Sequence, residues 1–250
     1  MLALGIDIGG SGIKGAPVDT VTGEPTAERF RLETPRPAAP KAVAEVVGEV
    51  AAHFDWTGPV GVTFPGVVLR GTIRTAANMD PESEWIGVDA VSLFGQALRS
   101  AEGKPPHILN DADAAGVAEM AHGVGRGRGG VVLMLTFGTG IGSALFLDGA
   151  LVPNTELGHL QLRGKDAEQR ASARIRDEKE LSWEKWAERV QEYLTHVEAL
   201  FSPELITVGG GVSKHADKFL PDLKTHAEIV AAQLANNAGI VGAAMAAASA

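Results

Sequence analysis

Apolar segments that run straight into glycine turns limit what this chain can fold into more than any other feature. Three such turns span Asp7–Gly12, Gly138–Gly142 and Gly209–Gly211. Glycine lets main-chain N–H groups approach an anion without a Cβ in the way, and phosphate is the commonest ligand of such turns. The Walker A pattern is absent, and the second turn lacks the long helix of a Rossmann fingerprint. The three turns together indicate binding of phosphate groups.

The turns belong to two similar halves, which predicts a duplicated α/β fold with two domains around a central cleft. Strands are expected at residues 2–8, 13–19, 25–35, 58–66, 107–111 and 204–209, with a strand, turn, strand and hairpin over 129–152. Helices are expected at residues 41–53, 89–100, 114–122, 183–201 and 236–248. The expected domains are residues 1–109, with the helix 237–250 packing back on them, and residues 110–236.

The composition favours a cytoplasmic protein with no nucleic-acid or membrane partner. Hydrophobic residues make up 45% and charged residues 21% of the chain, as in ordinary globular proteins, and the net charge of −9 argues against nucleic acid. The absence of cysteine excludes disulfides and cysteine-based zinc sites. The chain's start lacks a signal-peptide pattern, and the apolar run near its end is too short to span a bilayer.

The segment LNDADAAG, residues 109–116, places Asn110, Asp111 and Asp113 between a predicted strand and a predicted helix. Asp is a good helix N-cap, because its side chain accepts hydrogen bonds from the first free N–H groups. A carboxylate at a strand end is equally suited to act as a catalytic base. Capping accounts for one acid and leaves the other polar residues unexplained.

Six segments, in order along the chain, resemble the ROK family of sugar kinases within the actin-like ATPase superfamily. They are LGIDIGGSGIKG, TFPGVV, LNDADAAGVAE, LTFGTGIGSALFLDG, ELGHL and VGGGVSK. Three further stretches, RTAANMD, VPNTELGHL and NNAGIVGAA, are similar to the polyphosphate glucokinases of that family. The resemblance implies the actin-like (ribonuclease H-like) fold and phosphoryl transfer from inorganic polyphosphate, or also ATP, to the 6-hydroxyl of glucose. The family's cysteine-rich zinc motif is missing, so no zinc is expected.

The resemblance also implies a sugar site. It makes Asp111 the general base that accepts the proton of the sugar hydroxyl, with Asn110 orienting the sugar, and leaves Asp113 for the helix start. Further sugar ligands are implied at Gly66, Asn78, Glu156, His159 and Glu168. Taken alone, His159 also fits a structural histidine and Glu168 a solvated surface charge. Glu156 and His159 by themselves are too few ligands to make a metal site.

A donor site follows from the same resemblance. Asp7 matches the superfamily's aspartate that organises Mg²⁺, usually through water, and Mg²⁺ suits a protein whose net charge would otherwise repel phosphates. The implied donor-binding residues are Asp7, Gly9, Gly10, Ser11, Gly12, Lys14, Thr136, Gly138, Thr139, Gly140, Gly210 and Gly211. Lys14 fits an ordinary strand lysine equally well.

Several alternatives stay open at this point. An ATP-dependent kinase of another hexose, such as mannose or an N-acetylated sugar, would share these motifs, as would a sugar-sensing regulator of the family. The regulator is disfavoured because the first strand begins at residue 2, leaving no room for a helix-turn-helix. We expect a homodimer, with Trp183 and Trp186 in the core or the interface. Two basic tracks are candidate outer contacts for polyphosphate, and Arg126 and Arg128 are favoured. The other, the segment 163–179, has six basic residues but also four acids, so it is expected to be a solvated surface loop and helix start.

Overall fold

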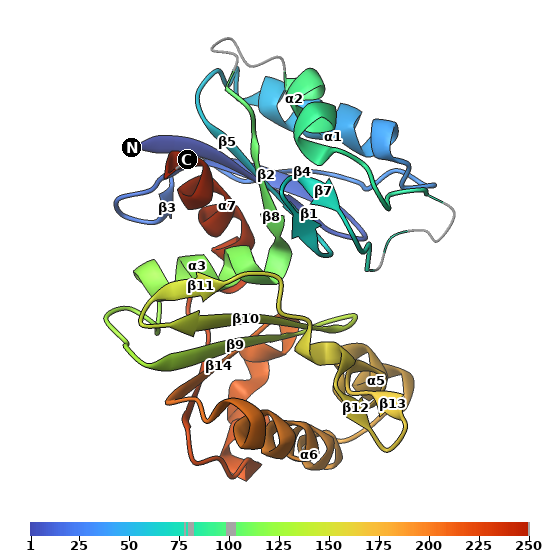
Figure 1. Ribbon diagram of the computed structural model, residues 1–250, viewed down its shortest axis with the longest axis vertical. Coiled ribbons are helices and arrows are strands. Elements are labelled where there is room, and N and C mark those ends of the chain that lie inside the picture. The colour runs from blue at the N-terminus through green and yellow to red at the C-terminus, as the bar shows by residue number, and fades with distance from the viewer. Residues whose placement is uncertain (78, 80–82, 99–103, 250) are drawn as a thin grey trace. The chain divides into compact units, whose positions relative to one another are not determined.

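The computed structural model describes residues 1–77, 79, 83–98 and 104–249 (Figure 1). The chain divides into two compact units, residues 1–118 with 237–250 and residues 119–236. Residues 110–118, expected in the second domain, therefore group with the first unit. The division falls within helix α3 (Asp111–His122).

The first unit is built on a mixed six-stranded sheet. Its strands are β1 (Leu2–Ile8), β2 (Ile13–Asp19), β3 (Glu24–Pro25), β4 (Phe30–Leu32), β5 (Val60–Phe64) and β8 (His107–Asn110). The strand order is β3-β2-β1-β5-β8, with β4 paired to β2. β1 is antiparallel to β2 and parallel to β5, and β5 is parallel to β8, so three strands end at one edge. A small ribbon of β6 (Val68–Leu69) and β7 (Thr72–Ile73) follows β5.

Helices cover both faces of this sheet (Figure 1). They are α1 (Pro40–His53), α2 (Ala90–Leu98) and α7 (Ala238–Ala248). Neighbouring residues of a strand point to opposite faces. Gly5 of β1 accordingly faces Ile240 of α7, while Ile6 joins the buried cluster that contains Val43 and Val47 of α1. Because α7 is made almost entirely of small residues, its backbone approaches the sheet closely.

The second unit repeats the same sheet order. Its strands are β9 (Val131–Phe137), β10 (Ile141–Leu147), β11 (Ala150–Val152), β14 (Leu205–Gly209) and β15 (Glu228–Ala231). The order is β11-β10-β9-β14-β15, with β9 antiparallel to β10 and parallel to β14. The predicted duplication is therefore confirmed at the level of topology. Helix α6 (Trp183–Phe201) packs on this sheet through Trp186, Val190 and Tyr193.

The structure differs from the sequence-based expectation in two segments. Residues 25–35, predicted as one strand, are strand only at Pro25, which ends β3, and at Phe30–Leu32, which is β4; a bend at residues 26–27 separates them. The segment 163–179, predicted as a surface loop and helix start, contains β13 (Lys165–Asp166), which pairs with β12 (Gln161–Leu162), and two short helices. The helices are α4 (Glu168–Ala171) and α5 (Ala173–Glu178). Ala167, Ala171 and Ile175 are buried there, so apolar residues hidden among charges hold the segment on the core.

No helix in the described ranges is both long enough and apolar enough to cross a membrane.

Gly61 of β5 allows the close approach of α7, because a Cβ there would overlap the carbonyl group of Ala243. We expect Gly61→Ala to push α7 from the sheet and lower the free energy of unfolding by about 1–3 kcal/mol. Denaturant unfolding followed by circular dichroism measures the change. Gly95→Ala is the matched control: a Cβ there meets only Pro106 at 3.5 Å. This helical replacement should stabilise by about 0.5–1 kcal/mol. Equal losses in both variants would contradict the packing argument.

Candidate active site

Three parallel strands bring polar side chains to one edge of the sheet in the first unit. Asp7 of β1 is level with Thr63 of β5, and Phe64 of β5 is level with Asn110 of β8. Asn110 ends its strand, and Asp111 begins the next helix. Open α/β sheets bind their ligands at the carboxyl ends of the strands. The candidate catalytic residues of this unit therefore lie where the fold favours a site.

Asn110 fixes the junction between β8 and α3. Its Oδ1 accepts hydrogen bonds from the main-chain N–H groups of Ala112 at 2.8 Å and Asp113 at 3.1 Å. Its Nδ2 donates to the carbonyl oxygen of Gly66 at 3.1 Å. Asn110 is therefore the N-cap of α3. Asp113, expected at the helix start, is not the cap: it lies buried inside the first turn of α3.

Asp111 is the first residue of α3 and is half-buried. The helix begins three residues earlier than the predicted start at Ala114, so Asp111 belongs to its first turn. The Oδ1 of Asp111 accepts a hydrogen bond from the N–H of Ala112 at 2.9 Å. The positive end of the helix dipole stabilises a carboxylate in this position. Since Asn110 makes the cap, the carboxylate of Asp111 is fixed in place without being needed to begin the helix.

Asp7 lies at the end of β1 between two partners. Its Oδ1 accepts a hydrogen bond from Thr63 Oγ1 at 2.7 Å, and its Oδ2 lies 3.0 Å from Lys14 Nζ. The side chains of Asp7 and Lys14 are 16% and 24% exposed, so this ion pair is largely shielded from water. Gly239, in the first turn of α7, leaves room for the carboxyl group. Lys14 is therefore a partner of Asp7 and more than an ordinary strand lysine.

The surroundings of Asp7 fit a magnesium ion held through water. Within the described ranges, no three His, Asp or Glu side chains gather as a protein-only metal site would require. Mg²⁺ commonly keeps several waters and binds through one or two carboxylates together with substrate phosphates. A single carboxylate beside a glycine turn matches that donor set.

The first glycine turn is held by side chains from β4 and the residues after it. Arg31 Nη2 donates to the carbonyl oxygen of Ser11 at 2.7 Å, and Thr34 Oγ1 donates to that of Gly9. A Cβ on Gly12 would overlap the guanidinium of Arg31. Gly10 and Ser11 are exposed at the tip of the turn. Arg31 therefore adds a positive charge to the predicted phosphate turn, which the sequence motif did not indicate.

Of the two further sugar residues predicted in this unit, Gly66 and Asn78, the structure describes only Gly66. Gly66 accepts the hydrogen bond from Asn110, and a Cβ there would overlap the carbonyl of Thr75, so only glycine fits. Asn78 lies outside the described residues.

The second unit brings Glu156 and His159 together on a short 3₁₀ turn, Leu157–His159. The Nε2 of His159 lies 3.9 Å from Glu156 Oε2, and its Nδ1 lies 2.9 Å from Asp166 Oδ2. Gln161 Nε2 donates to the other oxygen of Asp166. Asp166 therefore orients the imidazole, with Nδ1–H as the donor and Nε2 turned toward Glu156.

The pKa values of this pair are shifted in the same direction. The hydrogen bond to Asp166 raises the pKa of His159, and the carboxylates of Glu168 and Glu156 add to the effect while partial burial opposes it. Burial raises the pKa of Glu156, against the attraction of His159, and the charge of Glu168 raises it further. Each group therefore keeps its proton to a higher pH than the free side chain does. Such a pair can both donate and accept hydrogen bonds with vicinal hydroxyls.

Glu168 is not the solvated surface charge that its sequence context also allowed. It is half-buried at the start of α4, and its Oε2 accepts a hydrogen bond from the N–H of Ile141 at 3.3 Å. A Cβ on Gly140 would overlap the same oxygen. Glu168 thus lies against the second glycine turn and close enough to Glu156 and His159 to shift their pKa values.

The second and third glycine turns lie on adjacent strands. Thr136 of β9 is level with Gly209 of β14. Arg174 supports the second turn twice, since its N–H donates to Gly138 O at 3.1 Å and its Nε to Thr139 O at 3.0 Å. Gly210 has a φ of 83°, and a Cβ there would overlap the backbone of Phe137. These turns are therefore shaped by contacts that glycine alone permits.

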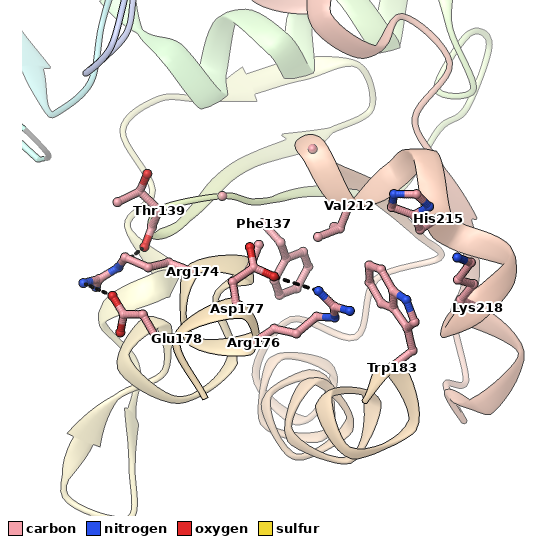
Figure 2. Close-up of a pocket in the computed structure, with 13 residues that line it drawn as sticks. Phe137, Thr139, Arg174, Arg176, Asp177, Glu178, Trp183, Val212, His215 and Lys218 are labelled. Atoms are coloured by element: carbon pink, nitrogen blue, oxygen red, sulfur yellow. Dashed lines mark hydrogen bonds and ion pairs between the residues drawn. The ribbon is translucent and has the colours of Figure 1, made fainter. Parts of the chain in front are cut away.

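A cavity of about 770 Å³ in the second unit adjoins both turns (Figure 2). Gly138, Thr139 and Gly211 line it together with Trp183 and residues of α5. Both tryptophans were expected in the core or a dimer interface. Trp186 is fully buried in the core, whereas Trp183 is half-buried and faces the cavity. The space therefore lies beside the predicted donor-binding residues.

Residues 3–172 match the ROK family. This chain belongs to the ROK family. It is 50% identical to the polyphosphate glucokinase of Mycobacterium tuberculosis (strain CDC 1551 / Oshkosh), over 97% of this chain and 89% of that protein. It is also 50% identical to the inorganic polyphosphate/ATP-glucomannokinase of Arthrobacter sp. strain KM, whose crystal structure it matches with a TM-score of 0.93 over 99% and 98% of the two chains.

A more distant structure bears on the fold alone. The ROK family glucokinase of Streptomyces griseus, solved with glucose and AMPPNP, is 24% identical and matches with a TM-score of 0.84 over the full length of both chains. The expected actin-like ATPase fold is confirmed.

Three side chains that position the candidate site lie outside the ROK family motifs found in the sequence. Asp166 orients His159, Arg31 supports the first glycine turn, and Arg174 supports the second. Asp166 and Arg174 come from the charged segment after the ELGH motif, where the sequence offered no pattern to separate them from surface charges. The only signal for Asp166 was the tight turn at residues 163–164, which returns the chain toward His159.

Asp166→Asn should lower the pKa of His159 toward its ordinary value of 6.5. The wild-type pKa is raised in the folded state. Protonation of His159 therefore adds stability below pH 6.5, and this stability is lost as the pH rises through the folded-state pKa. The variant should lose that contribution. NMR titration of the imidazole resonances measures it, with His107, whose pKa burial lowers, as the internal control. An unchanged His159 titration would show that Asp166 does not set it.

Proposed function

We propose that this protein transfers a phosphoryl group from inorganic polyphosphate, and also from ATP, to the 6-hydroxyl of glucose. The observation that carries the proposal is 50% identity, over nearly the whole chain, to a polyphosphate glucokinase and to a polyphosphate/ATP-glucomannokinase. The retained Asn110–Asp111 junction supports catalysis over a purely sugar-sensing role. A homodimer in the cytoplasm belongs to the same proposal.

Asp111 acts as the general base in this proposal. As the sugar oxygen forms its bond to phosphorus, the hydroxyl proton passes to the carboxylate of Asp111. The phosphorus–oxygen bond to the rest of the donor breaks, leaving a shortened polyphosphate or ADP. Phosphoryl transfer requires positioning and charge neutralisation more than covalent chemistry. The hydrogen bond from Ala112 and the cap made by Asn110 supply the positioning.

Sugar recognition falls to side chains that can exchange hydrogen bonds with hydroxyl groups. Glu156 and His159 bind sugar hydroxyls, with Asp166 holding the imidazole in one orientation. Asn110 and the backbone at Gly66 form a rigid edge for the sugar, because Asn110 ties the two segments together. Glu168 is proposed as a further ligand, and Asn78 keeps the role that the family resemblance implied.

The glycine turns bind the donor. Main-chain N–H groups of the turns, with Ser11, Thr136, Thr139 and Lys14, contact its phosphates. Mg²⁺ bound near Asp7 through water would neutralise the charge that develops on the phosphates. Lys14 balances Asp7 and contributes a second positive charge at the same point.

A kinase of another hexose is the second candidate, and the 50% identity to a glucomannokinase makes mannose the alternative sugar to test. Mannose differs from glucose only in the configuration at one hydroxyl. Assaying both sugars with each donor decides between them.

Asp111→Asn tests the proposed reaction. The amide cannot accept the proton, so we expect kcat with glucose to fall by about 10²–10⁴-fold with polyphosphate and with ATP alike. Glucose binding and the thermal unfolding midpoint should remain as in the wild type. Asp222→Asn, an exposed aspartate, is the matched control and should be fully active. A variant that keeps more than about a tenth of the wild-type kcat would exclude Asp111 as the base.

Glu156→Ala and His159→Ala test the sugar contacts. Each removes a hydrogen bond that involves a charged group, worth about 1.5–3 kcal/mol. We expect the KM for glucose to rise by about tenfold or more, while the KM for the phosphate donor changes little. Steady-state kinetics with each substrate varied in turn gives both values. Equal increases in the two KM values would mean that these residues support the fold instead.

A further inference from the structure

The cavity of the second unit contains a guanidinium group that rests on an aromatic ring. The carbon at the centre of the Arg176 guanidinium lies 3.7 Å from the centroid of the Trp183 ring. Figure 2 shows Arg176 extending from α5 toward Trp183, at the start of α6. Both residues line the cavity together with Gly138, Thr139 and Gly211 of the donor turns. A positive charge is thus held beside the predicted phosphate-binding backbone.

The ring and one neighbouring carboxylate hold this charge. Arg176 Nη1 donates to Asp177 Oδ1 at 2.7 Å, but the Asp177 side chain is 72% exposed whereas that of Arg176 is 23% exposed. Ion pairs with so exposed a partner contribute little. The Nε of Arg176 is buried and has no hydrogen-bond partner in the part of the chain that the structure describes. Trp183 is therefore the main support of the guanidinium, whose Nη2 makes no hydrogen bond within the described ranges.

The stacked guanidinium affects the two donor classes in opposite ways. A flat nucleobase binds well on an exposed tryptophan face, but here it would have to displace Arg176 from that face. A phosphate chain instead offers oxygens that a guanidinium binds through two parallel hydrogen bonds. Lys218 adds a second cation, with Nζ 6.0 Å from the same ring centroid.

We propose that Arg176, stacked on Trp183, is the donor-specificity residue: it binds phosphates of a polyphosphate chain beyond the group being transferred and disfavours a nucleoside in the same space. This inference rests on the proposed function, since it concerns the donor of that reaction. It also gives the phosphate chain a path through the cavity.

The loop at residues 123–130 is the competing path. Arg128 there already forms an ion pair with Glu228 at 2.8 Å, with both side chains about half exposed. An exposed pair on a loop holds its charge less firmly than a guanidinium stacked on a ring. The cavity is therefore favoured over Arg126 and Arg128 as the outer contact for polyphosphate.

Two substitutions at one position separate the two effects of Arg176. Arg176→Ala removes the charge and uncovers the ring, whereas Arg176→Met removes the charge but keeps a long side chain over it. With long-chain polyphosphate, both variants should lose about tenfold in kcat/KM, chiefly through KM. With ATP, the alanine variant should gain at least about twofold and the methionine variant should stay near the wild type. The loss with polyphosphate should shrink at high salt.

Lys185→Ala is the matched control, because Lys185 is an exposed lysine of α6 that pairs only with Glu188 among the described carboxylates. It should behave as the wild type with every donor. If Arg176→Ala loses kcat/KM equally with polyphosphate and with ATP, the inference is overturned. It is also overturned if only the Arg126→Ala/Arg128→Ala double variant loses kcat/KM specifically with polyphosphate. The proposed function itself fails if the wild-type protein phosphorylates glucose with neither polyphosphate nor ATP, and this outcome is distinct from those above. Thermal unfolding midpoints identify any variant that fails to fold.

Discussion

The side chain of Asn110 joins the three pieces of backbone on which the candidate active site depends. Its oxygen caps α3, and its nitrogen binds the carbonyl of Gly66 beyond the neighbouring strand β5. With 4% of its surface exposed, the amide makes these bonds away from competing water. One buried residue therefore fixes where β8 ends, where α3 begins and how the turn after β5 lies. The position of Asp111 follows directly, because it is the next residue along the chain.

The two units have the same sheet order but carry different chemistry at corresponding places. The first unit has a carboxylate, Asp7, near the end of β1 and before its glycine turn, whereas β9 of the second unit ends in Thr136 and Phe137. The first unit adds Asp111 after its last parallel strand. The second has Gly210 and Gly211 after the strand next to β9. The two units thus share one scaffold with a glycine turn after the first strand, whereas the acids Asp7 and Asp111 belong to the first unit and Glu156 and Glu168 to the second.

Residues that act through their neighbours in the sequence were predictable, and residues that act through distant contacts were not. The glycine turns and the strand before Asp111 follow from local pattern, because apolar runs and glycines act within a few positions. Asp113 was expected at the helix start, but Asn110 makes the cap, because Asn and Asp are equally good caps and only the end of β8 decides between them. The pairing of Asp166 with His159 depends on a two-residue ribbon that no periodicity reveals.

Short-range positive charge explains how a chain with a net charge of −9 can suit phosphate donors. Arg31 and Arg174 each bind a carbonyl oxygen of a glycine turn, at Ser11 and at Thr139. These arginines shape the turns and also set a cation beside each one. At physiological salt, charges farther than about 8 Å are strongly screened. The acids spread over the rest of the surface therefore count for little at the turns. The local field is set by the groups beside them, which are Arg31 and Arg174 together with the carboxylates of Asp7 and Glu168.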